Sequence, residues 1–315
     1  MSSWAEMGGQ VAAAEAFVLT ALCVILVIDV FLTDRTRWLT YVLSLLTLAG
    51  AAYMTVRYGV QARVTAFDGM YIADPMGDVL KLFSYGTVAV SFLYSREYLQ
   101  RRGLFKGEYF ILGLVALLGV MVMVSAGSLL TVYLGVELLS LSLYAMVAFD
   151  RESGVAAESA MKYFVLGAIS SGTLLYGFSI VYGVTGTLQL DELAVGVREV
   201  GAANLGLVFG LAFIIVGIAF KFGAVPFHMW VPERMPSRMK PTCEIVEYAS
   251  MRLRFVCAIA TTLPMSSDST ASAISMSCQL ATIASRPSAS TRIASTNEAI
   301  FGAEPMNSVT GVGAP

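Results

Sequence analysis

The chain has 315 residues, of which 57% are hydrophobic and only 13% are charged, and its mean hydropathy is +0.73. Soluble domains contain roughly 45–50% apolar and about 25% charged residues, so this composition excludes an ordinary soluble domain. The apolar residues gather in long runs, which is typical of proteins that cross a bilayer. The net charge of -2 gives no indication of a nucleic-acid partner.

The cysteine and histidine content excludes several kinds of site. Four cysteines are widely separated along the chain, and we interpret them as packing residues because no paired spacing indicates a disulfide framework or a metal site. They are Cys23, Cys243, Cys257 and Cys278. A single histidine, His228, excludes a histidine-rich metal or haem site.

Long apolar runs predict an all-α, polytopic membrane protein. A bilayer core about 30 Å thick requires about 20 apolar residues of helix. By this measure we expect about seven transmembrane helices, at roughly 15–33, 38–56, 78–95, 109–125, 128–149, 161–183 and 204–226. The run from 109 to 149 is too long for one crossing, so we expect a tight turn at residues 125–128 (SAGS). An acidic segment precedes the first run, so we expect a retained helix instead of a signal peptide.

Basic residues in the connections predict the orientation. The connections after the first, third and fifth predicted helices contain seven lysines and arginines in total. The connections on the opposite side contain three. Cytoplasmic loops are enriched in these residues. The count therefore places the N-terminus outside the cytoplasm.

Two charged residues lie within apolar helices, where a charge costs at least ~2.5–3.5 kcal/mol and is a functional candidate. Glu137 lies near the middle of its helix with no basic residue within one turn. Either it passes protons, or neighbours such as Ser140 hold it protonated or hydrogen-bonded for helix packing. Lys221 either snorkels to the interface or lies in a polar cavity where Gly223 and Pro226 break the helix.

Three further residues are weaker candidates for the same chemistry. Glu158 and Lys162 are four residues apart, a spacing that fits an ion pair on one helix face, whether functional or only a surface contact. His228 follows Lys221 by seven residues. Histidine suits proton transfer near neutral pH, although a lone histidine is more often structural. We expect Asp29 and Lys81, near helix ends, to meet only the lipid headgroups.

Three segments resemble a known family. They are residues 133–144 (YLGVELLSLSLY), 158–168 (ESAMKYFVLGA) and 220–232 (FKFGAVPFHMWVP). In this order they are similar to the antiporter-like subunits of proton-pumping NADH:quinone oxidoreductase, complex I, and 161–168 looks most like the bacterial N subunits. The resemblance covers about residues 15–232.

The resemblance implies a function and a set of site residues. Glu137 matches the family's glutamate in the fifth helix, and Lys221 matches the central lysine of a broken seventh helix. Glu158 and Lys162 match charged positions between them, and His228 matches a position on the onward proton route. It also implies a location in the bacterial inner membrane and contacts with other membrane-arm subunits and lipid. No cofactor is implied here, since other subunits use NADH and quinone.

The chain departs from the family pattern after Pro232. Residues 233–315 contain 13 serines and no long apolar run, whereas the family continues with an eighth helix and a second repeat. We therefore divide the chain into an N-terminal segment (1–14), three helices (15–108), a partial antiporter-like repeat with helices four to seven (109–232) and a tail (233–315). The tail is expected to be disordered.

Two back-translated segments of the tail support a specific hypothesis for its origin. Reverse complements of residues 302–315 and 248–254 spell strings that resemble later family segments in reversed order. We hypothesise that the tail translates the antisense strand of the same gene. The alternatives for the whole chain are a multisubunit cation/proton antiporter subunit and a non-functional fragment.

Overall fold

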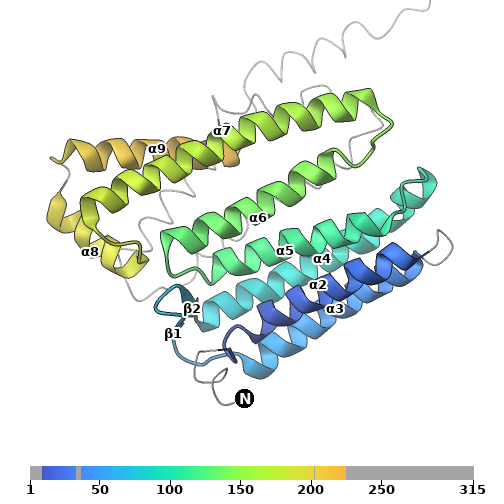
Figure 1. The fold of residues 1–315 in the computed structure, drawn as a ribbon. Coiled ribbons are helices and arrows are strands. Elements are labelled where there is room, and N and C mark those ends of the chain that lie inside the picture. The colour runs from blue at the N-terminus through green and yellow to red at the C-terminus, as the bar shows by residue number, and fades with distance from the viewer. Residues whose placement is uncertain (1–8, 33–36, 202, 225–315) are drawn as a thin grey trace, which may run out of the picture. The chain divides into compact units, whose positions relative to one another are not determined.

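The computed structural model describes residues 9–32, 37–201 and 203–224 (Figure 1). Within these residues the chain is almost entirely helical, with one short antiparallel hairpin. The elements are α2 (Ala13–Phe31), α3 (Trp38–Tyr58), β1 (Val64–Ala66), β2 (Tyr71–Ala73), α4 (Pro75–Arg101), α5 (Gly107–Val124), α6 (Leu129–Val147), α7 (Gly154–Thr185), α8 (Leu190–Val200) and α9 (Leu205–Lys221).

Among the described residues, five helices are long and apolar enough to cross a membrane. They are α2, α3, α5, α6 and the part of α7 that covers Ala156–Thr185. Helix α9 is also apolar but has 17 residues, and α4 includes several charged side chains. Large apolar side chains such as Val27, Tyr94 and Ile169 are exposed on these helices. Lipid tails would solvate such surfaces, whereas water would not.

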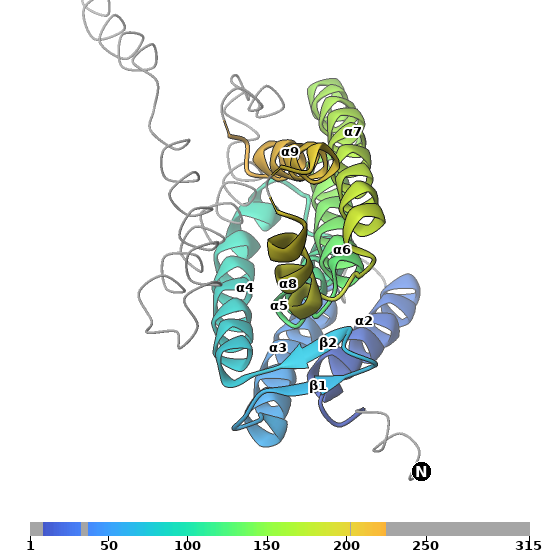
Figure 2. The same ribbon diagram turned by 90° about the vertical axis from the view of Figure 1, so that its left-hand side faces the viewer.

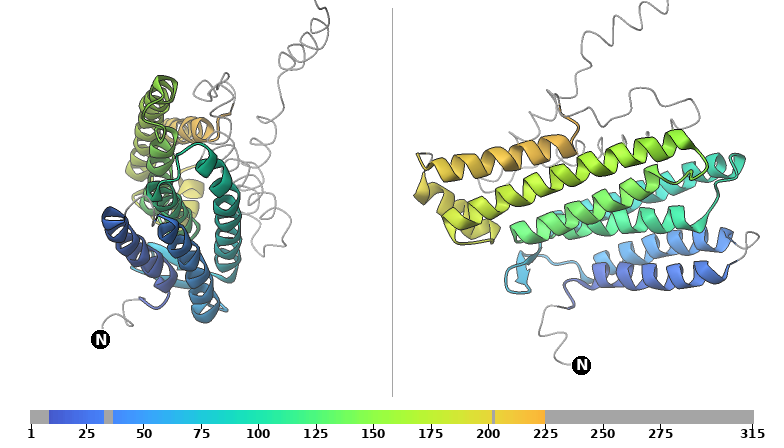
Figure 3. Two further views of the ribbon diagram at one scale, coloured as in Figure 1. Left: turned by 90° about the vertical axis from the view of Figure 1, so that its right-hand side faces the viewer. Right: turned by 45° about the horizontal axis from the view of Figure 1, so that its top comes forward.

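The helices lie side by side, mostly antiparallel to their sequence neighbours (Figures 1 and 3). Helix α2 contacts α3 and α5, α5 contacts α6, α6 contacts α7, and α7 contacts α9. Helix α4 packs on α3 and α5. Helix α6 therefore connects the bundle of α2 to α5 with α7 and α9, and the charged residues 137 and 221 lie on α6 and α9.

The bundle of α2 to α5 is organised around Phe110, whose side chain is fully buried. The rings of Tyr41, Phe92 and Tyr109 meet it edge-on, with centroid separations of 5.2, 5.3 and 5.4 Å. Edge-to-face contacts of this kind add roughly 0.5–1.5 kcal/mol per pair beyond the burial of area. The aromatic cluster therefore fixes the positions of α3, α4 and α5.

Side-chain caps explain where several helices begin. Asp74 accepts a hydrogen bond from Gly77 N at 2.6 Å, and Pro75 follows as the first helical residue of α4. Ser128 and Ser153 accept from the amides of Thr131 and Ala156 at the starts of α6 and α7. Each such cap satisfies an amide that lacks an intrahelical partner.

The hairpin closes one end of the helices (Figure 2). Its turn contains Phe67 and Asp68, both with positive φ, and Gly69. Ile72 N donates to the carbonyl oxygen of Ser125 at 2.8 Å, which ties the hairpin to the turn between α5 and α6. The carbonyl of Gly127, in the same turn, accepts from Leu190 N at 3.0 Å. Helix α8 and the hairpin are thus both held by this turn.

The predicted helices and the turn at 125–128 compare closely with the structure, with two corrections. Helix α5 ends at Val124 and α6 begins at Leu129, which confirms the turn. The third predicted helix, 78–95, is α4, which extends from Pro75 to Arg101 because its ends are polar and Asp74 caps its first turn. The sixth, 161–183, is α7, which begins at Gly154, so Glu158 lies inside the helix.

The sequence analysis missed α8 and the hairpin. Helix α8 has 11 residues and is amphipathic, with Leu190 and Leu193 packed against Leu174 and Phe178 and its charges exposed. An apolar-run criterion cannot detect such a helix. The predicted seventh helix, 204–226, begins as expected, but α9 ends at Lys221. The tail, 233–315, lies outside the described residues.

The prediction that Lys81 meets lipid headgroups is wrong. Lys81 is 2% exposed, and its ammonium group lies 2.7 Å from Glu15 Oε1. The hairpin folds over the start of α4 and covers this side chain, which a sequence pattern cannot reveal. Asp29 was also expected to meet the headgroups, but its carboxylate accepts a hydrogen bond of 2.6 Å from Thr40 Oγ1 on α3.

Candidate functional site

Glu137 and Lys221 are 84 residues apart and meet across α6 and α9. The Nζ atom of Lys221 lies 3.6 Å from Oε2 of Glu137, and the two side chains are 17% and 23% exposed. Both helices contact α7, which lies between them in the packing order. The sequence analysis singled out both residues, and the structure brings them together.

Helices α7 and α9 lie side by side (Figure 3), and glycines on both let them approach closely. A Cβ atom added at Gly177 would lie 2.9 Å from the carbonyl oxygen of Gly210, and one at Gly217 would lie 2.8 Å from Leu174 Cβ. Ser170 Oγ also donates to the carbonyl oxygen of Gly217 at 3.1 Å. Small residues at helix interfaces are the usual means of close packing in membranes.

Two serines connect the charged pair by hydrogen bonds. Ser171 Oγ donates to Glu137 Oε2 at 2.6 Å and accepts from Lys221 Nζ at 2.8 Å. Lys221 also donates to Ser140 Oγ at 2.8 Å, and Ser140 in turn donates to the carbonyl oxygen of Val136. The hydroxyl of Ser171 therefore forms a continuous hydrogen-bonded link between the ammonium and the carboxylate.

The end of α9 favours a positive charge at Lys221. Lys221 is the last residue of the helix, where the unpaired carbonyl groups carry a partial negative charge. Gly223 follows with a φ of 61°, so the helix does not continue directly beyond this point. At 3.6 Å the attraction to Glu137 is about 4–5 kcal/mol with an effective dielectric constant of ~20. That attraction offsets a desolvation penalty of several kcal/mol per ion.

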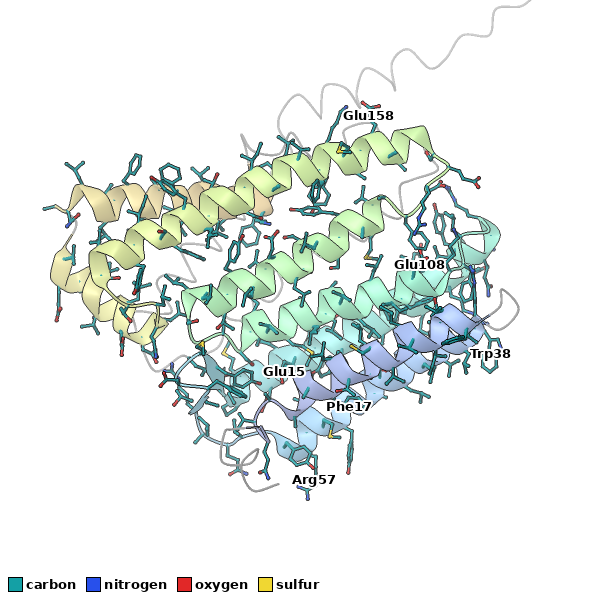
Figure 4. All side chains as sticks on the ribbon, viewed as in Figure 1. Glu15, Phe17, Trp38, Arg57, Glu108 and Glu158 are labelled. Atoms are coloured by element: carbon teal, nitrogen blue, oxygen red, sulfur yellow. The ribbon has the colours of Figure 1, made fainter. Side chains whose placement is uncertain are left out.

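The other predicted site residues do not join this pair in the described part of the chain. Lys162 Nζ lies 2.6 Å from Glu158 Oε1, which confirms their ion pair, but both side chains are about two-thirds exposed. Figure 4 shows Glu158 at the outer edge of α7. Lys162 is nine residues from Ser171, or about 13 Å along the helix axis. His228 lies outside the described residues.

The sequence analysis missed Ser171. Its signal is present, because Ser170 and Ser171 are adjacent hydroxyls in the middle of a long apolar helix, where polar side chains bond across helices. Their partners on α6 and α9 become clear only in three dimensions. Among the described residues, no group of three or more His, Cys, Asp or Glu side chains could hold a metal ion.

Comparison with known proteins identifies a related family. Residues 126–284 match the family described as NADH:quinone oxidoreductase/Mrp antiporter, TM, a range that contains Glu137, Ser171 and Lys221. It also extends past Pro232, the boundary predicted from the sequence.

One curated relative is NADH-quinone oxidoreductase subunit N of Thiobacillus denitrificans. It is 60% identical over 219 residues, which are 70% of this chain and 45% of the relative. The chain thus spans about half the length of the curated relatives that it matches.

Solved structures share the fold. Respiratory complex I from Thermus thermophilus matches with a TM-score of 0.58 and 24% identity, over 86% of this chain and 63% of that one. The Mrp complex from Dietzia sp. matches with a TM-score of 0.59 and 19% identity, over 88% and 58%. With a family match over half of its length, the chain belongs to the NADH:quinone oxidoreductase/Mrp antiporter membrane family.

Proposed function

We propose that this chain is a proton-translocating membrane-arm subunit of an NADH:quinone oxidoreductase, and that Glu137 and Lys221 pass the proton. The observation that carries the proposal is the hydroxyl of Ser171, which bonds to both charged groups within 2.8 Å. This link gives a proton a continuous hydrogen-bonded route between the two charged groups. The identity to curated N subunits supports the assignment to this complex.

The proton moves between the two charged groups through Ser171. When the pair is charged, Lys221 donates to the serine oxygen and the serine donates to the Glu137 carboxylate. Transfer of one proton from Lys221 to the serine, with release of the serine proton to Glu137, leaves a neutral amine and a carboxylic acid. Separation of α6 and α9 weakens the attraction that holds the charged form, and so drives this exchange.

Glu158, Lys162 and His228 extend the relay beyond the central pair. The exposed ion pair of Glu158 and Lys162 lies near the N-terminal end of α7, away from Ser171, where water can hydrate it. Histidine exchanges protons near neutral pH, so His228 suits the onward step after Lys221. These roles come from the family resemblance, and each calls for a separate variant.

In the membrane, α4 and α9 join the five long apolar helices, which gives seven crossings with the seventh interrupted after Lys221. The buried ion pair of Lys81 makes α4 less polar than its sequence indicates. The exposed charges of α8 suit the membrane surface. The excess of basic residues in alternate connections places the N-terminus on the periplasmic side of the bacterial inner membrane.

The partners of this chain are the other membrane-arm subunits and the lipid bilayer, and nucleic acid has no part in its function. NADH and quinone react in other subunits, so this chain holds no redox cofactor. It converts a conformational or electrostatic drive from those subunits into proton movement.

Two alternatives to the proposed function can each be tested separately. A subunit of a multisubunit cation/proton antiporter is favoured by the likeness to the Mrp complex, and the neighbouring genes separate the two cases. The second alternative is a chain without function of its own. Co-expression with the other membrane-arm subunits, followed by purification of the complex, tests whether the chain is incorporated. The DNA across Pro232 tests the antisense origin of residues 233–315.

Proton pumping by the assembled complex tests the function itself. Replacing Lys221 with alanine removes the group that donates to both serines, so pumping should be lost. The matched control is Lys106→Ala, a lysine in the connection before α5. Pumping by Lys221→Ala at the control's rate would show that this residue does not carry the proton.

A further inference from the structure

Three side-chain oxygen atoms of the described residues converge on the ammonium group of Lys221. Ser140 Oγ and Ser171 Oγ each lie 2.8 Å from Nζ, and Glu137 Oε2 lies 3.6 Å from it. Two of these oxygens belong to α6 and one to α7, whereas the ammonium belongs to α9. We call the three atoms the oxygen site. Both of its serines are buried.

Hydrogen bonds that do not involve Lys221 orient both hydroxyls of the oxygen site. Ser140 donates its hydroxyl hydrogen to the carbonyl oxygen of Val136 at 2.8 Å, and Ser171 donates to Glu137 Oε2 at 2.6 Å. A hydroxyl has one hydrogen to donate and two lone pairs that accept. Because both hydrogens are directed elsewhere, both oxygens present lone pairs to Nζ. The oxygen site is therefore arranged for a cation, whether or not that cation belongs to a lysine.

The charge of the oxygen site matches one monovalent cation. The site combines one carboxylate, Glu137, with two neutral hydroxyls, so the ammonium of Lys221 makes it neutral. A divalent ion in its place would leave an uncompensated positive charge, which is costly where the side chains are mostly buried. Alkali cations also bind to oxygen atoms that replace their hydration shell. Na⁺ is therefore the kind of ion that competes with the ammonium for these oxygens.

The covalent attachment of the ammonium to α9 gives it an advantage over a free ion. Ser170 donates to the carbonyl oxygen of Gly217 at 3.1 Å, which fixes α9 against α7 one turn before Lys221. A tethered group reaches its site at a high effective concentration and loses little translational freedom, whereas a free ion loses that freedom on binding. The ammonium can also release a proton, which Na⁺ cannot replace.

We propose that Lys221 determines the ion specificity of the relay, because its tethered ammonium fills the oxygen site in place of Na⁺. The inference rests on the proposed transfer of a proton between Lys221 and Glu137. In that transfer Lys221 gives one proton to Ser171, and Ser171 gives its own proton to Glu137. The carboxylate loses its charge in the same step in which the ammonium does, so the neutral state does not attract Na⁺ either.

Thermal unfolding of the full chain in lipid vesicles, in NaCl or in choline chloride at equal ionic strength, tests this role. Lys221→Ala removes the tethered cation and leaves the three oxygens. Na⁺ at ten times its dissociation constant should therefore raise the unfolding midpoint by roughly 3–6 °C. The unmodified chain should unfold at the same temperature in both salts.

The control for the negative charge is Glu137→Gln combined with Lys221→Ala, which should abolish the effect of Na⁺. Equal midpoints of Lys221→Ala in the two salts would overturn the proposal. An equal effect of Na⁺ on the single and the double variant, or on the unmodified chain, would also overturn it.

A second variant decides the case if Lys221→Ala does not fold, as judged by its circular dichroism. Lys221→Met keeps the apolar stem and lacks the terminal nitrogen, so Na⁺ should again raise the midpoint, and equal midpoints in both salts would overturn the proposal. Proton pumping separates this inference from the proposed function. Loss of pumping in Lys221→Ala without any effect of Na⁺ would refute the specificity role alone, whereas full pumping would refute the proton transfer itself.

Discussion

Replacement of Ser171 by alanine tests the hydroxyl link most sharply. The direct separation of Lys221 Nζ and Glu137 Oε2 is 3.6 Å, which is too long for a hydrogen bond. Ser171 divides it into contacts of 2.8 and 2.6 Å. Hydrogen bonds to charged groups contribute about 1.5–3 kcal/mol each. If the transition state loses one such bond, proton transfer slows roughly 10- to 150-fold, since 1.36 kcal/mol is about tenfold in rate.

The assay is the initial rate of proton uptake per NADH oxidised in inverted membrane vesicles, followed with a pH-sensitive dye. Thr173→Ala is the matched control, because Thr173 lies on the same helix and donates only to the carbonyl oxygen of Ile169. We expect the ratio to fall in Ser171→Ala and to remain unchanged in the control. Equal ratios in the two variants would refute the role of the serine in the proton path.

Three further replacements follow from the packing and the ion pairs. Lys81→Met leaves Glu15 buried without its cation, which should destabilise the fold by about 3–5 kcal/mol and lower its thermal unfolding midpoint. Unaltered thermal unfolding would contradict a buried, charged pair. Gly177→Ala forces a methyl group against the backbone of α9, so we expect a loss of about 1–3 kcal/mol in the same measurement. A wild-type midpoint would show that α7 and α9 are not closely packed there. Glu158→Gln breaks an exposed ion pair with Lys162, so pumping should decrease while the thermal midpoint stays constant. Full pumping would remove Glu158 from the relay.

The apolar helices and the central charged pair were predictable from the sequence. Long runs of apolar residues located α2, α3, α5 and α6 to within about two residues at most ends, because lipid solvation imposes one composition along the whole helix. A charge in such a run is expensive, which singled out Glu137 and Lys221. Both signals are local, so one sequence contains them.

The remaining features depend on contacts between distant segments. Ser171 is significant only because α9 brings Lys221 beside it, and no spacing in the sequence encodes that approach. Lys81 lies near the start of α4, where a lysine usually reaches the lipid headgroups, but Tyr71 of the hairpin and Glu15 bind it instead. Helix α8 has the alternating polarity of a surface helix and is too short for a crossing.

The most direct test of the account is the number of protons moved per NADH oxidised by complexes that contain Glu137→Gln. The amide keeps the size of the side chain but accepts no proton, and Lys221 loses its counter-ion. Glu97→Gln, on the exposed part of α4, is the control for a lost carboxylate elsewhere. We predict that pumping is lost in Glu137→Gln and retained in Glu97→Gln. Equal pumping by the two variants would contradict proton transfer through Glu137.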